Sequence, residues 1–361
     1  MKIDKQLIFY TILLSCFGIL MIYSASFVWA EYKFGDPLKF AFAQSIFFII
    51  GLIIMLVISK IPYVIYKEKS NLIFGISLIL LIAVLIPGVG IVRNGSRSWF
   101  GIGSLGIQPS EFMKLALIIF TAKYLEKNYK QLENIKKGVF PILGINVLVF
   151  GLIMLQPDFG SGMIIFSSVI ILLFIGGVDM NFFFKLGGIG IGFISILVAI
   201  APYRLARILS FLNPWSDPLG SGFQIIQSLY AIGPGGLLGQ GLFSSVQKNF
   251  YLPEPQTDFI FSIISEELGF MGVIIVLTIM GLIIYRGLFI AFKQKDLYAK
   301  YVAIGISLQI AVQALLNIMV VIGLLPVTGV TLPFLSYGGS SLVISLISIG
   351  IILNISRYSE K

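Results

Sequence analysis

The sequence predicts an all-α polytopic membrane protein with about ten transmembrane helices. Of its 361 residues, 58% are hydrophobic and only 11% are charged, and the mean hydropathy is +1.01. So few charges cannot cover the apolar surface of a soluble protein, and lipid must therefore surround most of the chain. Apolar runs long enough to span a membrane lie near residues 7–30, 39–59, 71–88, 110–124, 138–156, 161–178, 182–201, 259–285, 301–323 and 335–355.

The positions of the basic residues predict the orientation. If the N-terminus is cytoplasmic and the runs alternate, most of the 25 Lys and Arg residues fall on the inner side. The positive-inside rule then places both termini in the cytoplasm. This topology also accounts for the net charge of +9 without nucleic acid as a partner. The outer side holds only Lys33, Lys39, Arg93, Arg97, Arg204, Arg207 and Lys248.

The apolar runs fill nearly the whole chain, so we expect one membrane domain over residues 1–361. Two long connections lie on the outer side, at about 89–109 and about 202–258, and the larger one joins helices 7 and 8. Loops of this length are usually functional or disordered, and their aromatic and glycine-rich composition is not typical of disorder. We expect them to fold back onto the membrane as short helices or re-entrant turns and to shape an outward-facing cavity.

The segment 253–259, PEPQTDF, places an acid directly before an apolar run. Asp258 could cap the following helix, because Asp is favoured at that position. It could also be a general base. The chain has no histidine, so a proton acceptor on the outer side must essentially be a carboxylate. A carboxylate beside an apolar surface has its pKa raised toward neutrality, and both interpretations stay open.

Rare cations distinguish the stretch RNGSRSWFGIGSLGIQPSEFMKLAL at 93–117. Arg97 and Trp99 could anchor the chain at lipid headgroups. Lys114 lies three residues after Glu111 in a predicted membrane helix, where a simple ion pair is one interpretation. A charge at membrane depth usually faces a cavity. Arg97 and Lys114 could therefore together hold an anionic group such as a phosphate.

Other polar segments favour structural interpretations. Asp158, in QPDFGSG, is typical of a turn that caps a helix. A stripe on one helix face, formed by Gln309, Gln313 and Asn317, favours interhelical hydrogen bonds over a substrate path. The glycine-rich segment 231–241 lacks the Lys and Ser/Thr of a P-loop and indicates close backbone packing or a hinge. The irregular segment 325–341 must be buried in protein or line a wet cavity.

These motifs together resemble the SEDS family, named for shape, elongation, division and sporulation. The resemblance extends over essentially the full chain, and within the family the sequence is more similar to the division and sporulation branches, FtsW and SpoVE, than to the elongation branch, RodA. The stretches that carry it include YSAS, GSRSWFGIGSLGIQPSEFMKLAL, QPDFGSG, FLNPWSDPLGSGFQIIQSLYAIGPGGLLGQGL, YLPEPQTDFIFSIISEELGF and PVTGVTLPFLSYGGSS.

The resemblance implies a peptidoglycan glycosyltransferase. Such enzymes polymerise lipid II, a disaccharide-pentapeptide carried on undecaprenyl pyrophosphate, at the outer face of the bacterial cytoplasmic membrane and with inversion at the sugar. The family's essential acid falls on Asp258, which is expected to be catalytic. The expected substrate-binding residues are Arg97, Ser98, Trp99, Ser110, Glu111, Lys114, Asp158, Arg204, Glu254 and Glu267.

The resemblance also implies partners. A class B penicillin-binding protein would supply the transpeptidase and activate the polymerase, with its single helix against the eighth and ninth membrane helices, and other division or elongation proteins would join the complex. The sequence identifies no cofactor with certainty, and a requirement for Mg²⁺ or Mn²⁺ stays open. Two alternative functions remain: a lipid II flippase, which needs alternating access but no base, and a non-catalytic division scaffold.

Overall fold

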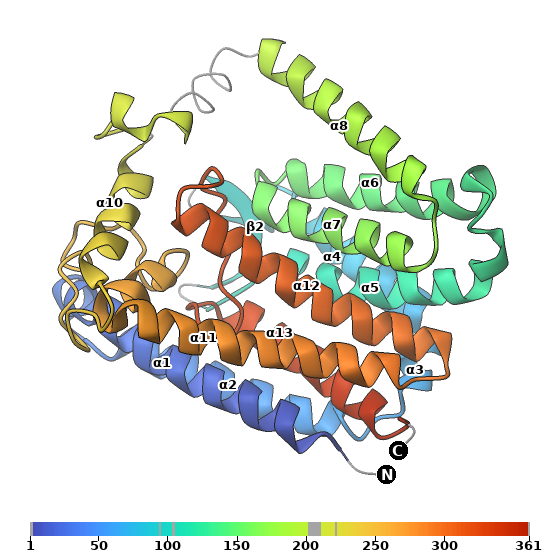
Figure 1. The fold of residues 1–361 in the computed structure, drawn as a ribbon, viewed down its shortest axis with the longest axis horizontal. Coiled ribbons are helices and arrows are strands. Elements are labelled where there is room, and N and C mark those ends of the chain that lie inside the picture. Colours follow the sequence, from blue (N-terminus) through green and yellow to red (C-terminus); the bar gives the residue numbers. More distant parts are fainter. Residues whose placement is uncertain (1–2, 94, 103–104, 201–210, 221, 360–361) are drawn as a thin grey trace.

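The computed structural model describes residues 3–93, 95–102, 105–200, 211–220 and 222–359, and helices dominate it (Figure 1). Each of the ten predicted apolar runs overlaps one of these helices: α1 (Lys5–Phe34), α2 (Lys39–Ile58), α4 (Ser70–Ala83), α5 (Pro109–Asn128), α6 (Phe140–Met154), α7 (Phe159–Ile175), α8 (Met180–Ile200), α11 (Ile260–Phe292), α12 (Leu297–Val321) and α13 (Gly339–Ser356). The shorter helical elements are α3 (Tyr63–Glu68), α10 (Phe223–Ile232) and single turns at Tyr129–Gln131, Ile135–Val139, Pro214–Ser216 and Gly233–Gly235.

Several of these helices are membrane spans by length and composition. Within the described residues, six helical segments are long and apolar enough to cross a membrane, and α4 and α7 are shorter apolar helices. The chain is therefore a helical, multi-pass protein, as predicted. The six segments are Lys5–Phe34, Lys39–Ile58, Ile135–Met154, Ile260–Phe292, Leu297–Val321 and Gly339–Ser356.

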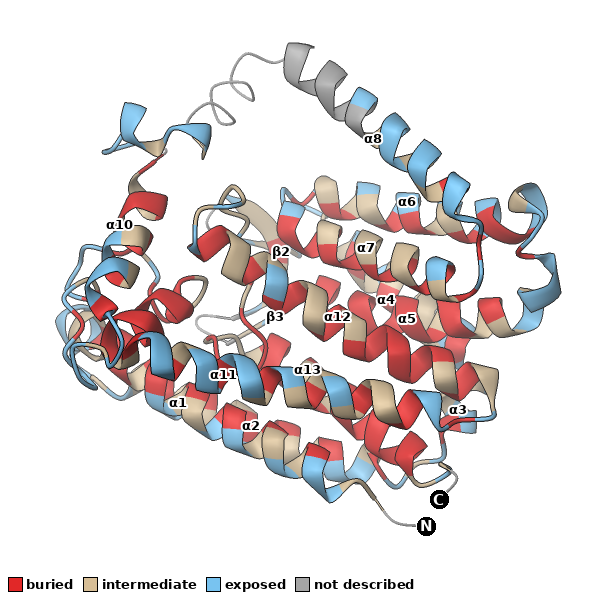
Figure 2. Cartoon of the chain, in the orientation of Figure 1, coloured by how far each residue is buried: buried red, intermediate tan, exposed pale blue. Residues whose placement is uncertain are grey.

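The most buried helices lie inside the bundle. The most apolar window of α13 is 78% buried and that of α12 is 61% buried, whereas those of α2 and α11 are only 22% buried. Figure 2 shows buried residues concentrated on α5, α12 and α13. The exposed residues of α2 and α11 are largely apolar, such as Phe42, Ile53, Phe270 and Ile275. Apolar outward faces are expected of helices that contact lipid.

The connection between α4 and α5 forms a small sheet, so the prediction that 89–109 folds as short helices or re-entrant turns, within an all-α chain, is wrong. Strands β1 (Ile91–Arg93), β2 (Ser96–Ile102) and β3 (Leu105–Ile107) pair in antiparallel order, with Val92 opposite Arg97. The sequence favours strands here because aromatic and β-branched residues flank an Asn-Gly pair, which is a strong hairpin signal. The φ of Gly95 is +80°, a conformation that suits glycine.

The chain ends and the Asp258 segment lie at opposite ends of the bundle (Figure 1). The two termini meet, because the backbone N–H of Asp4 donates to the Ser356 hydroxyl over 3.2 Å. At the other end, α1 contacts the segment before α11, where the rings of Tyr32 and Phe250 lie 5.3 Å apart. The two terminal segments therefore lie at the same end of the bundle.

The connection 323–338 between α12 and α13 folds into the bundle. Its Leu332 and Leu335 are almost fully buried. The side-chain amide of Gln44, on α2, donates to the Ser336 carbonyl over 3.1 Å. On α1, Gly18 packs so closely that an added Cβ would lie 2.4 Å from the Phe334 carbonyl oxygen. Residues 330 and 332–336 of the irregular segment are therefore buried in protein, as predicted, whereas residues 325–329 are partly or fully exposed.

Helix α11 is broken near its start. Gly269 has φ 63° and ψ −162°, which separates residues 260–268 from the longer part of the helix. The glycine-rich segment fills the break with backbone hydrogen bonds. After the break, the N–H groups of residues 270 and 271 donate to the carbonyls of residues 236 and 237. Before the break, the carbonyls of residues 266 and 267 accept from the N–H groups of residues 240 and 241. A Cβ on Gly239 would lie 2.1 Å from the Glu267 carbonyl oxygen. The predicted close backbone packing is therefore confirmed.

The contact at Gly18 leads to a stability prediction. We expect Gly18→Ala to destabilise the folded protein by about 1–3 kcal/mol, because the methyl group would force α1 away from residues 334 and 335. The matched control is Gly144→Ala, a helical glycine whose added Cβ meets no atom within 4 Å and which should be neutral or stabilising. Melting temperatures in detergent measure both, and equal effects would contradict the packing argument.

Candidate functional site

Asp258 lies just before α11 and does not cap it. The N-cap residue of α11 is Phe259, and no side chain provides a capping hydrogen bond. The capping interpretation of Asp258 is therefore wrong. The side chain is half-buried, and within the described part of the chain its carboxylate has no hydrogen-bond partner. An unused carboxylate oxygen at such a position is free to accept a proton from a bound molecule.

The polar stripe on α12 fixes the backbone at this site. The Asn317 amide donates to the carbonyl oxygens of Asp258 and Val330, each over 2.7 Å. One turn earlier, the Gln313 amide donates to the Thr331 carbonyl over 3.0 Å. These two residues of the stripe have a structural role, but the bonds described here go to connecting segments and not to other helices. Helix α12 thus joins the Asp258 segment to the connection between α12 and α13.

The surroundings of Asp258 disfavour its ionised form. Burial, followed by the negative charges of Glu254 and Asp158, raises the pKa of Asp258 from 3.8 to about 7. Glu254 has a left-handed φ of 51°, which is uncommon for a non-glycine residue and turns the chain sharply before Asp258. These two acids thus act on Asp258 through their charge.

Asp158 also has the capping role that its motif predicts. Its carboxylate accepts from the backbone N–H of Ser161 over 3.1 Å and so caps α7. The Gln108 amide donates to the other carboxylate oxygen over 2.8 Å. Because Gln108 directly precedes α5, this contact joins the starts of α5 and α7 near the site.

Lys114 forms the ion pair that its spacing from Glu111 suggests. Its ammonium lies 2.8 Å from the Glu111 carboxylate and donates to the Gln313 side-chain oxygen over 2.9 Å. Both charged side chains are nearly fully buried and line a cavity of about 10 Å³ with Gln309 and Ser348. Gln313 therefore contacts both Lys114 and the Thr331 backbone, and Asn317 on the same helix contacts Asp258.

The residues of the sheet are held locally. The Arg97 guanidinium lies 3.5 Å from the Leu85 carbonyl oxygen. Ser98 is buried, and its hydroxyl lies 3.1 Å from that of Ser96. The Trp99 ring lies 5.1 Å from the Arg93 guanidinium, within cation–π range.

Of two further predicted site residues, the structure describes Ser110 but not Arg204. Ser110, at the start of α5, is fully buried, and its hydroxyl has no partner among the described residues. Arg204 lies outside the described residues.

Glu267 lies in a buried ionic cluster. Its side chain is 0% exposed and lies 2.7 Å from the Lys248 ammonium. The Ser24 hydroxyl donates to the same carboxylate, over 2.6 and 2.7 Å to its two oxygens. The sequence resemblance predicts Glu267 as a substrate contact and does not predict its contacts with Lys248 and Ser24. The available signal was Lys248 itself, a single cation within an otherwise uncharged stretch of the long loop.

A cavity of about 240 Å³ lies beside the segment that leads to Asp258. Four consecutive residues, 253–256, form one wall of it. The Gln256 side-chain oxygen is buried and has no partner within the described residues. The remaining lining residues are Trp29, Lys248, Phe250 and Leu252.

The described residues contain no cluster of three or more Asp, Glu, Cys or His side chains placed to hold a metal ion. Two carboxylates, those of Glu254 and Asp158, lie close enough to Asp258 to affect its charge.

A bundle of apolar helices with an unused carboxylate at the start of one helix defines a multi-pass membrane protein with a polar site at one end of the bundle. The family model described as cell cycle protein, FtsW/RodA/SpoVE, matches residues 5–361. The chain belongs to this family.

Curated relatives match the full length. Stage V sporulation protein E of Bacillus subtilis (strain 168) is 54% identical over 358 residues, which cover 99% of this chain and 98% of that protein. A probable peptidoglycan glycosyltransferase FtsW of Trichlorobacter lovleyi is 42% identical over 353 residues, covering 98% of this chain and 93% of that protein. These identities agree with the predicted similarity to the division and sporulation branches.

Solved structures share the fold. A chain from a peptidoglycan synthase complex has a TM-score of 0.81 and 29% identity, and the match covers 99% of this chain and 98% of that one. The rod shape determining protein RodA of Thermus thermophilus has a TM-score of 0.69 and 26% identity, with coverage of 100% and 99%.

The two hydrogen bonds of Asn317 can be tested by stability. We expect Asn317→Leu to cost about 1–3 kcal/mol, because the carbonyls of Asp258 and Val330 would lose their donor in a buried position. The control is Gln309→Leu, a polar-to-apolar change on the same face of α12, which should have little effect. Melting temperatures of the two purified variants measure both effects. An equal loss in both would show that the Asn317 bonds contribute nothing specific.

Proposed function

We propose that this chain polymerises lipid II into glycan strands at the outer face of the bacterial cytoplasmic membrane. Full-length relatives named as probable peptidoglycan glycosyltransferases, and a structural neighbour from a peptidoglycan synthase complex, support the enzyme class. The chain is accordingly a peptidoglycan glycosyltransferase of cell-wall synthesis. The observation that carries the mechanism is the Asp258 carboxylate, which has a pKa of about 7 and no hydrogen-bond partner among the described residues.

In the proposed mechanism, Asp258 is the general base. Its carboxylate takes the proton from the sugar 4-hydroxyl of the acceptor lipid II. The resulting oxygen attacks the anomeric carbon of the growing chain from the face opposite the leaving group. A new C–O bond forms, the bond to the lipid pyrophosphate breaks, and the pyrophosphate leaves with the electron pair. The configuration inverts, and the proton remains on Asp258 until solvent removes it.

The raised pKa suits this role. A carboxylate with the ordinary pKa of 3.8 is a weak base, whereas one with a pKa of about 7 accepts a proton more readily and is still about half ionised at neutral pH. The same shift makes the ionised form unfavourable in the folded protein, so the site costs folding free energy as the pH rises from about 4 to about 7.

Cations would stabilise the pyrophosphate as it leaves, because it gathers negative charge in the transition state. Arg97 and Lys114 are the proposed groups, together with Arg204. The Lys114 ammonium also contacts Glu111 and Gln313, so it would supply positive charge from a fixed position within a buried ion pair. A Mg²⁺ or Mn²⁺ ion bound to the pyrophosphate would add to this charge, and no step in the proposal needs it.

The proposed topology has ten spans, cytoplasmic termini and the Asp258 segment outside. The termini lie opposite that segment, and the cavity of about 240 Å³ beside residues 253–256 gives space for part of a sugar. An apolar groove between helices would hold the polyprenyl chain within lipid. A class B penicillin-binding protein would place its helix against α11 and α12, and the exposed apolar face of α11 supports this. Other division or elongation proteins would complete the complex.

Two other functions make different predictions. A lipid II flippase would make no polymer from substrate supplied on its own side of the membrane. A division scaffold would not need the Asp258 carboxylate. Among the described residues Asp258 has neither a capping nor a pairing role, which favours the enzyme over both.

We expect Asp258→Asn to reduce polymerisation of purified lipid II by several orders of magnitude, because the amide cannot accept the proton. The same variant should melt at or above the wild-type temperature at pH 8, because it lacks a carboxylate that is costly to ionise. A gel assay of glycan strands, with and without the penicillin-binding partner, measures the activity. Asp179→Asn, a change at an exposed acid in the turn between α7 and α8, is the control and should retain activity. Wild-type rates in Asp258→Asn would exclude the base assignment.

The pH dependence gives a second test. Polymerisation should rise with pH and reach half its maximum near pH 7, because only ionised Asp258 is active. In Glu254→Gln the half-maximum should move to lower pH, because one of the charges that raises the pKa of Asp258 is gone. Initial rates between pH 5 and 9 measure both. An unshifted profile in the variant would show that Glu254 does not act on Asp258.

A further inference from the structure

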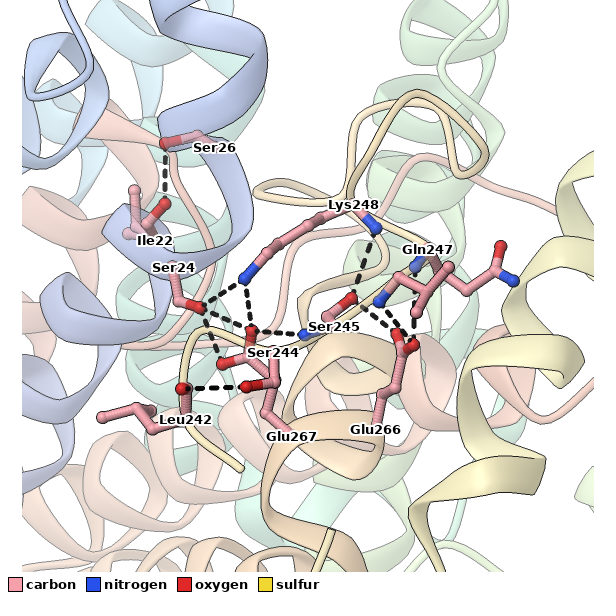
Figure 3. A network of polar contacts seen from close by, with 11 residues as sticks. Ile22, Ser24, Ser26, Leu242, Ser244, Ser245, Gln247, Lys248, Glu266 and Glu267 are labelled. Carbon is pink, nitrogen blue, oxygen red and sulfur yellow. Dashed lines mark hydrogen bonds and ion pairs between the residues drawn. The ribbon is translucent and has the colours of Figure 1, made fainter. Parts of the chain in front are cut away.

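The buried cluster at the start of α11 ties three separate parts of the chain together (Figure 3). Lys248, from the long loop, extends to Ser24 on α1 and to Glu267 on α11, and its ammonium lies 2.7 Å from the Glu267 carboxylate. All three side chains are almost fully buried. Charges at such depth are retained only where they are paired and hydrogen-bonded, and removing one partner is strongly destabilising.

The neighbouring Glu266 binds the loop backbone. Its carboxylate accepts from the Ser245 hydroxyl over 2.5 Å and from the backbone N–H of Val246 over 2.8 Å. Figure 3 shows the Glu266 side chain directed at residues 245–247, while Glu267 is directed at α1. The two consecutive acids therefore hold the loop and α1 at the same time.

The cluster fixes both ends of the segment that carries Asp258. Lys248 lies ten residues before Asp258 and Glu267 lies nine residues after it, and the two side chains are in direct contact. The chain between them is a closed loop. Within it, the Tyr337 N–H donates to the Gln256 carbonyl over 2.8 Å, and Asn317 holds the Asp258 carbonyl. The break at Gly269 separates this loop from the rest of α11, so the long helix alone does not fix its position.

We propose that Lys248, Glu267 and Ser24 are positioning residues that hold Asp258 in place for proton transfer. This inference rests on the proposed function, because it assigns the cluster to the geometry of that reaction. Lys248 also lines the cavity of about 240 Å³, whereas Ser24 and Glu267 are not among its lining residues, and in this proposal all three affect the reaction through the position of Asp258. They act by fixing the closed loop against α1, and a general base that is displaced by about 1 Å can lose about 10²-fold in rate.

The chain offers a matched pair of variants on α1. Ser24→Ala removes the hydroxyl that donates to Glu267, whereas Ser26→Ala removes an equally buried hydroxyl that donates only to the Ile22 carbonyl of its own helix. Figure 3 shows both side chains. We expect Ser24→Ala to lower kcat for lipid II polymerisation by about tenfold with KM changed less than threefold, and Ser26→Ala to stay within twofold of wild type.

A second pair tests the ion pair itself. We expect Lys248→Met to lower kcat by about 10²-fold. Arg286→Met breaks the ion pair between Asp4 and Arg286, which joins α1 and α11 at the other end, and should keep kcat within threefold even where it lowers the melting temperature. Lys248→Arg should restore part of the lost rate, because the charge is kept.

The pH profile separates positioning from simple loss of fold. If the closed loop loosens, water reaches Asp258, so the half-maximum should move to lower pH in Ser24→Ala and Lys248→Met. A structural role alone would reduce the amount of active enzyme but would not change the pH at which the polymerisation rate is half its maximum. If Lys248→Met does not fold, Ser24→Ala carries the same test with a smaller change.

The outcomes are distinct when wild type and Asp258→Asn are assayed alongside. A wild-type protein that makes no polymer would overturn the proposed function and this inference with it. An active wild type with equal kcat and equal pH profiles in the Ser24 and Ser26 variants would overturn the inference alone. A loss of rate in Lys248→Met that only follows its folded fraction, as in Arg286→Met, would do the same.

Discussion

Backbone groups in lipid must find partners within the protein, and this constraint shapes the whole site. A break in α11 at Gly269 leaves donors and acceptors without partners inside the helix, and the backbone of the glycine-rich segment pairs with them. Only glycine fits where the two stretches cross, at Gly239 and Gly269. The break releases a short helical piece from the long membrane helix. That piece directly follows Asp258, so the geometry of the site depends on how the break is filled.

Two buried ion pairs differ from Asp258 in how their charges are compensated. Lys114 with Glu111, and Lys248 with Glu267, form close pairs in which each charge offsets the cost of burying the other. Asp258 has neighbours of its own sign instead, so its ionisation is unfavourable near neutral pH. This contrast explains why one carboxylate is suited to proton transfer while others, equally close to helix starts, are structural.

The sequence predicts the helical bundle well because apolar runs in lipid have few alternatives to helix. It also predicts that Asp258 lies just before a helix and that the polar stripe of α12 forms an interhelical hydrogen bond, which Gln313 makes with Lys114. It fails at the sheet around Trp99, because the Asn-Gly hairpin signal is short and local beside the long apolar runs. It does not predict the contact between Glu267 and Ser24. Ser24 lies 243 residues earlier in the chain, so this contact arises only when α1 and α11 pack, and no local pattern indicates it.

The buried connection between α12 and α13 has a practical consequence. It contacts α1 through Phe334, α2 through Ser336 and α12 through Val330, so foreign residues inserted there would disturb three helices at once. The short turn at Tyr129–Gln131 has no buried residues and extends from the end of α5. Epitope tags and fluorescent reporters for mapping membrane sidedness therefore belong at that turn, even though both sites are equally irregular connections in the amino-acid sequence.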